Sequence, residues 1–152
     1  MALTVSRPRT IEQDGRLKAY RPLSAARRRR AFDTGLAAYE RGDAFLAHEI
    51  LEPAWMGSRV LAERELYQAL IKLAAAEVHA VRGNPTGVAK NLRGALARLE
   101  KAQAGAFHGG LDLVALQDHV SDRIRAIEGG RASAGRPLVD PRLPREGAAR
   151  PS

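Results

Sequence analysis

The chain of 152 residues contains no cysteine. This absence excludes disulfides, thiolate metal sites and cysteine nucleophiles, and it fits a reducing compartment. The sequence also lacks an apolar run of about 18 residues, the length that would span a membrane. Its first residues, 1–9, contain no apolar stretch of signal-peptide length. We therefore expect a soluble cytoplasmic protein with no membrane partner.

Acidic residues are in the minority, and the net charge is +8. The excess lies at the two ends, because residues 1–30 carry a net charge of +7 and residues 129–152 carry +3, whereas residues 31–128 carry −2. Aromatic residues make up only 5% of the chain, and no nucleic-acid-binding motif is present. We expect no specific nucleic acid as partner. Weak, salt-dependent binding of phosphates by the basic termini remains compatible with the composition.

The distribution of proline, glycine and apolar residues predicts one domain with two tails. Residues 1–22 are expected to form a flexible basic arm, and residues 129–152 a disordered tail rich in proline, glycine and arginine. Between them, apolar residues recur at helical spacing, and no stretch alternates with a period of two. The predicted fold class is all-α, with a single small antiparallel bundle of about five helices over residues 23–128 and flexible basic termini.

Start and stop signals place the five helices. They are expected over about Ser24 to Arg41, Ala44 to Met56, Val60 to Arg82, Pro85 through Leu99, and Leu113 through Ile127. Asp43 and Asn84 are predicted N-caps. Pro53 lies inside the second of these helices, where it either kinks the helix or ends it early.

The second predicted helix carries the most reactive residue types of the chain. His48, Glu49 and Glu52 fall on one face, opposite an apolar face that must meet the core. Phe45 lies within that polar face and Trp55 at its edge. Because large aromatic side chains are usually covered, we expect another segment to pack over this face.

The third predicted helix is expected to supply partners for this face. Gln68 and His79 project in nearly the same direction, so a cluster of His48, Glu49, Glu52, Trp55, Gln68 and His79 is a candidate site. One interpretation is a divalent metal site for zinc, iron or manganese, with His48, Glu52 and His79 as ligands. The other, which we favour, is a buried hydrogen-bond network.

No complete catalytic motif supports the metal interpretation. Glu52 stands where the zinc motif His-Glu-x-x-His has its second histidine, and no residue three places before a histidine is a glutamate. Glu77 lies on the apolar stripe of the third helix, either as an edge residue that reaches solvent or as a functional buried acid.

The order of several motifs resembles a known family. The motifs are Phe32-x-x-Gly35, Gly42-Asp43, Phe45, Ala47-His48-Glu49-x-Leu51-Glu52-x-x-Trp55, Gln68-x-Leu70-Ile71-x-Leu73-Ala74, His79 and Gly83-Asn84. Over about residues 31–100 they resemble the domain-of-unknown-function family numbered 309, a group of small all-helical bacterial-type proteins. The resemblance implies an all-α fold and no established activity. It also implies that the family's characteristic polar and aromatic positions correspond to the six residues of the candidate cluster. Leu46, Ala69 and Lys72 depart from residues common in the family.

These observations lead to two hypotheses for function. The first is a non-catalytic interaction or scaffold protein whose His/Glu/Gln cluster is structural, with a protein partner or a homo-oligomer as its complex. The alternative is a metal-dependent hydrolase or other small enzyme that uses His48, Glu49, Glu52 and His79.

Overall fold

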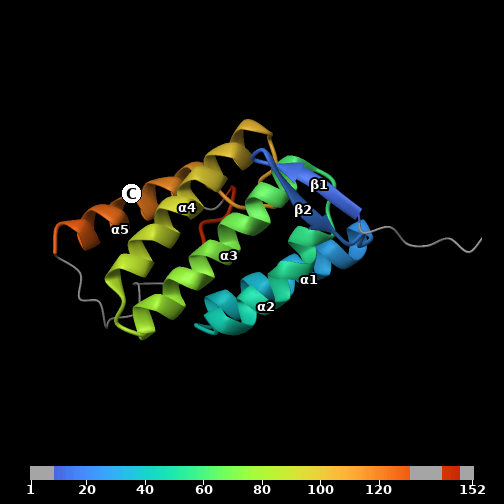
Figure 1. Cartoon of the computed structure of the whole chain (residues 1–152). Coiled ribbons are helices and arrows are strands. Elements are labelled where there is room, and N and C mark those ends of the chain that lie inside the picture. Colours follow the sequence, from blue (N-terminus) through green and yellow to red (C-terminus); the bar gives the residue numbers. More distant parts are fainter. Residues whose placement is uncertain (1–8, 131–141, 148–152) are drawn as a thin grey trace, which may run out of the picture.

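Five helices dominate the computed structural model, which describes residues 9–130 and 142–147 (Figure 1). The helices are α1 (Ala25–Glu40), α2 (Ala44–Met56), α3 (Leu61–Val81), α4 (Pro85–Ala104) and α5 (Leu113–Glu128). Each helix packs against the next one along the chain, as short connections require. The predicted helical bundle is confirmed, and its helix bounds differ from the prediction by a few residues at most.

The helix boundaries follow from local capping chemistry. Four N-cap side chains accept a hydrogen bond from the backbone N–H three residues later, and these residues are Ser24, Asp43, Asn84 and Asp112. Helix α2 continues through Pro53 and ends at Met56. Pro53 therefore does not end the helix early.

The core is built from small and aliphatic side chains on the facing sides of the helices. Leu66 and Leu70 of α3, Leu92 and Leu99 of α4 and Leu116 of α5 are all buried. Helices α1 and α2 approach closely where Gly35 meets Leu51. A Cβ atom added at Gly35 would lie 2.6 Å from the Leu51 Cγ atom, so this contact requires glycine.

A β-hairpin corrects the prediction of a purely all-α fold. Strands β1 (Arg9–Gln13) and β2 (Arg16–Tyr20) pair antiparallel within the segment expected to be a flexible arm. The two turn residues, Asp14 and Gly15, have φ angles of 54° and 72°, as a type I′ turn demands. A two-stranded ribbon alone is only marginally stable. It is ordered here because one of its faces packs on the bundle.

A second correction concerns residues 142–147, which lie in the segment expected to be a disordered tail. Leu143 is buried, the backbone N–H of Asp112 donates to the carbonyl of Pro144 (2.9 Å), and Arg145 forms an ion pair with Glu40. This short segment therefore packs against the bundle. The remaining parts of the predicted arm and tail, 1–8, 131–141 and 148–152, lie outside the described residues.

Candidate functional site

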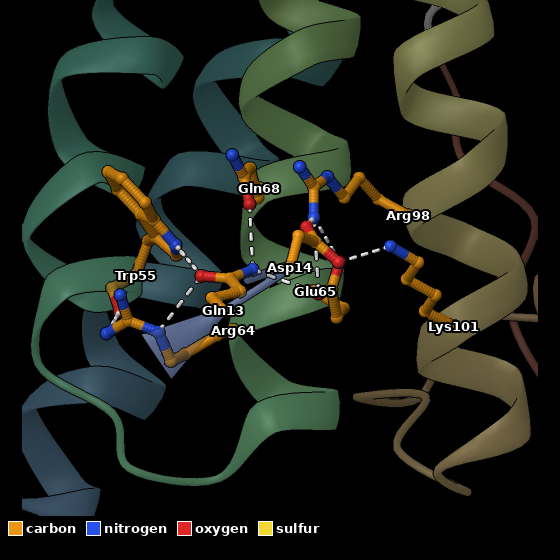
Figure 2. A network of polar contacts seen from close by, with 8 residues as sticks. All are labelled: Gln13, Asp14, Trp55, Arg64, Glu65, Gln68, Arg98 and Lys101. Atoms are coloured by element: carbon orange, nitrogen blue, oxygen red, sulfur yellow. Dashed lines mark hydrogen bonds and ion pairs between the residues drawn. The ribbon is translucent and has the colours of Figure 1, made fainter. Parts of the chain in front are cut away.

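The side chain of Gln13, at the end of β1, is the centre of a buried polar network (Figure 2). It is only 3% exposed. Its Nε2 donates to Gln68 Oε1 (2.8 Å) and Glu65 Oε1 (3.1 Å), while its Oε1 accepts from Trp55 Nε1 (3.1 Å) and Arg64 Nε (3.2 Å). A primary amide has two N–H donors and two acceptor lone pairs. All four are used, so this one side chain joins the hairpin to α2 and α3.

Arg64 extends the network beneath the hairpin. Its side chain is fully buried, and its Nη1 donates to the backbone carbonyls of Trp55 (2.9 Å) and Ser58 (3.1 Å). The guanidinium carbon lies 5.3 Å from the centroid of the Trp55 ring, a cation–π distance. Removal from water lowers the pKa of Arg64. The carbonyl groups and the indole ring thus compensate for part of the lost hydration of this cation, while its buried Nη2 has no hydrogen-bond partner within the described residues.

Two carboxylates connect the network to α4. Glu65 is buried, and its two oxygens accept from Arg98 Nη1 at 3.2 and 3.0 Å. Asp14, in the hairpin turn, forms ion pairs with both Arg98 and Lys101 (Figure 2). Loss of hydration lowers the pKa of Arg98. The hairpin is therefore held by hydrogen bonds on one side and by ion pairs on the other.

A cavity of about 460 Å³ lies between the hairpin and helices α3 and α4. Its lining residues are Gln13, Asp14, Arg16, Lys18, Lys72, Gly94, Ala97, Arg98 and Lys101. Five of these side chains are cationic and only Asp14 is anionic. Within the described residues, Arg16, Lys18 and Lys72 form no ion pair. We refer to this cavity as the cationic cleft.

Two further carboxylates, the buried Glu63 and the half-buried Glu77, are paired elsewhere in the bundle. Glu63 accepts from Arg28 Nε and from the Tyr67 hydroxyl, both at 2.7 Å. Burial, followed by the hydrogen bond to Glu63, raises the pKa of Tyr67.

The second of these carboxylates is Glu77, which links α3 to α1 and α5. It accepts from the Tyr39 hydroxyl (3.4 Å) and forms an ion pair with Arg123 (3.5 Å). Burial, followed by the charge of Glu77, raises the pKa of Tyr39. Glu77 on the apolar stripe therefore has a structural role between helices.

The structure brings together two of the six residues of the predicted cluster. Trp55 and Gln68 meet through Gln13. His79 lies at the other end of α3, where its Nδ1 is 3.1 Å from the Asn84 Nδ2 atom at the N-cap of α4.

The remaining three predicted residues lie on the outer part of α2. His48 and Glu52 are half-buried and Glu49 is exposed. Over the stretches 9–130 and 142–147, their side chains form no hydrogen bond or ion pair. No group of three or more histidine, aspartate or glutamate residues in that described part of the chain is arranged to hold a metal ion.

The expectation that another segment covers the polar face of α2 is wrong for its first half. Phe45 is 65% exposed. The hairpin and the residues that follow it instead cover the C-terminal end of α2. Trp55 Nε1 donates to Gln13 of β1, and the backbone N–H groups of Arg21 and Leu23, just after β2, donate to the carbonyls of Met56 and Gly57. Trp55 is covered at that end, whereas Phe45 lies almost three turns away.

Sequence reasoning missed the residues that organise the site. Arg64 and Glu65 belong to an unbroken charged run, Glu63-Arg64-Glu65, which is typical of a solvated helix face. Gln13 lies in the segment expected to be flexible. One local signal was present, since Asp14-Gly15 is a strong indicator of a two-residue hairpin turn. Nothing in the sequence links that turn to α3 and α4, so the cleft was not predictable from local pattern.

Comparison with known proteins supports the family resemblance. Residues 32–91 match the family described as a domain of unknown function (DUF309). The match includes the six residues of the predicted cluster and Lys72, but not the hairpin or the α4 residues that line the cleft. No curated protein and no solved structure matches the chain. Among the described residues, no helix is long and apolar enough to cross a membrane.

Proposed function

We propose that this chain is a non-catalytic, cytoplasmic interaction protein that binds an anionic partner in the cationic cleft. The observation that carries the proposal is the charge of the cleft. Arg16, Lys18 and Lys72 line it without a carboxylate partner among the described residues. Cations gathered along the walls of a cleft focus a positive potential, which attracts and orients anions.

The hairpin register supports this role. Because side chains alternate between the two faces of a strand, Arg16 and Lys18 lie on the same face of β2. In the antiparallel register, Gln13 pairs with Arg16 on that face, and it is the residue that fixes the hairpin to the bundle. The contact that buries Gln13 therefore also turns these two cations toward α3 and α4.

The composition of the cleft favours binding over catalysis. Its described lining contains no histidine, serine, threonine, tyrosine or cysteine. Its single carboxylate, Asp14, is neutralised by Arg98 and Lys101. A general base must be free to accept a proton, and this carboxylate is engaged by two cations. The metal-dependent hydrolase using His48, Glu49, Glu52 and His79 is not proposed, because no observed geometry favours it.

The proposal is tested by titrating the full chain with dextran sulfate, a non-specific polyanion, at low and moderate salt. Trp55, the only tryptophan, reports binding through its fluorescence because it belongs to the adjacent network. The double variant Lys18→Gln/Lys72→Gln is expected to weaken binding by about tenfold or more.

The matched control is Lys90→Gln, since Lys90 is exposed on the same helix as Arg98 but lies outside the cleft. This control should bind dextran sulfate like the unaltered chain. If the double variant also binds like the unaltered chain, binding occurs through the basic termini and the proposed function is wrong.

A further inference from the structure

We infer that the cationic cleft binds a small molecule through a diphosphate or triphosphate group. This inference rests on the proposed function and narrows the anionic partner to one chemical class. Three features of the cleft support it: its uncompensated charge, its size and lining, and the fixed position of Lys72.

The charge of the cleft matches a short phosphate chain. Asp14 already compensates part of the charge of Arg98 and Lys101. Arg16, Lys18 and Lys72 then remain, and they carry a formal charge of +3. A diphosphate or triphosphate ester presents about two to four negative charges within a few ångströms, and lysine and arginine are the usual donors to phosphate oxygens.

Asp14 shows how an oxyanion is stabilised at one wall of the cleft. Its carboxylate lies between the side chains of Arg98 and Lys101, which both belong to α4 (Figure 2). The hairpin turn thus places an anion of the chain itself beside α4. The uncompensated cations belong to β2 and α3, so the space for an external anion lies next to Asp14 and not at its position.

The size and lining of the cleft favour a small ligand. A volume of about 460 Å³ falls in the range of small-molecule sites. No aromatic side chain is among its described lining residues, so this lining offers no platform for stacking a nucleobase. Proteins that bind single-stranded nucleic acid usually combine cations with such platforms. The recognised part of the ligand is therefore its phosphate chain.

The position of Lys72 is restricted before any ligand arrives. Its stem lies against Gly94 of α4, where an added Cβ atom would be 2.9 Å from the Lys72 Cδ atom and 3.4 Å from Nζ. Glycine at this position leaves room for the lysine to lie across α4 inside the cleft. Restricting a long side chain in advance lowers the entropy cost of binding.

The experiment measures binding of inorganic phosphate, pyrophosphate and tripolyphosphate to the full chain by isothermal titration calorimetry. Affinity is expected to rise from phosphate to pyrophosphate to tripolyphosphate. Lys72→Gln is expected to weaken tripolyphosphate binding by about tenfold, because one charge-assisted contact is lost. Lys90→Gln is the control and should leave the affinity unchanged. Circular dichroism melting without ligand shows whether each variant is folded.

Each outcome of this experiment decides the inference. It is overturned if pyrophosphate and tripolyphosphate do not bind, if they bind no tighter than phosphate, or if folded Lys72→Gln binds them like the unaltered chain. A short oligothymidylate that binds tighter than tripolyphosphate, with the same dependence on Lys72, would identify a nucleic-acid strand instead. Should dextran sulfate still require Lys18 and Lys72 while the small phosphates fail, only this inference is lost. Should dextran sulfate binding also be independent of them, the proposed function is lost as well.

Discussion

The two ends of α2 (Ala44–Met56) present polar and aromatic side chains in different environments. At the N-terminal end, Phe45 is 65% exposed and His48 has no hydrogen-bond partner within the described residues. At the C-terminal end, Trp55 donates to Gln13 and stacks near the buried Arg64. Both ends contain the residue types from which functional sites are built. Only the end that the hairpin covers becomes an ordered polar network.

The difference between the two ends of α2 shows that polar side chains form a hydrogen-bonded network where another segment, here the hairpin, covers them. A buried polar group is costly unless it is hydrogen-bonded, whereas an exposed one is satisfied by water. The hairpin removes water from Arg64, Glu65 and Trp55, and Gln13 replaces the lost hydrogen bonds. Nothing in the described structure removes water from Glu49, so it requires no partner.

The largest expected effect is at the covered end. Gln13→Ala removes four hydrogen bonds at once and leaves the groups of Arg64, Glu65 and Trp55 without that partner. We expect the free energy of unfolding to fall by about 3 kcal/mol, as measured by urea denaturation. Glu12→Ala, an exposed change in the same strand, is the control and should cost less than about 0.5 kcal/mol. Equal effects of the two variants would show that the network does not hold the hairpin.

An intermediate effect is expected for buried Tyr67, away from the hairpin. At neutral pH, Tyr67→Phe should cost about 1 kcal/mol, because the hydrogen bond to Glu63 is lost. The pKa of Tyr67 is raised in the folded state. An unfolded tyrosine has a pKa of about 10. The stability that Tyr67 gains from its raised pKa is therefore fully present below pH about 10, and it is lost as the pH rises from there through the folded pKa.

The measurement for Tyr67 is urea denaturation across the alkaline range. The unaltered chain should lose stability above pH about 10, and Tyr67→Phe should lose less over the same interval. Tyr39, whose pKa is also raised, provides a second variant, Tyr39→Phe, with the same expected direction. A steeper alkaline loss in either variant would contradict the raised pKa values.

The smallest expected effect is at the uncovered end of α2. His48→Ala and Glu49→Ala should each change the free energy of unfolding by no more than about 0.5 kcal/mol, because neither side chain has a partner to lose among the described residues. Thermal melting of each variant measures the change in stability, and melting with added zinc or manganese shows whether either metal binds. A large loss of stability, or a metal-dependent rise of the melting temperature that His48→Ala abolishes, would restore the predicted cluster as a site.

Much of the helical architecture was predictable because its signals are local. The caps at Asp43 and Asn84, the spacing of Leu66, Leu70 and Leu73, and the loop before α5 depend on residues within a few turns of one another. The candidate cluster was predicted only in part. Trp55 and Gln68 do meet, but the side chain that joins them comes from residue 13, far away in the sequence.

The sequence by itself determined the helices, their order and the absence of cysteine chemistry, because helical periodicity and capping are properties of short segments. Only the tertiary structure decided where the hairpin packs. This placement buries Gln13, Arg64 and Glu65, and it brings Arg16 and Lys18 into the lining of the same cleft as Lys72. The reason is that a marginal two-stranded ribbon has little stability of its own. Its position depends on contacts with helices more than 40 residues away, which no local pattern records.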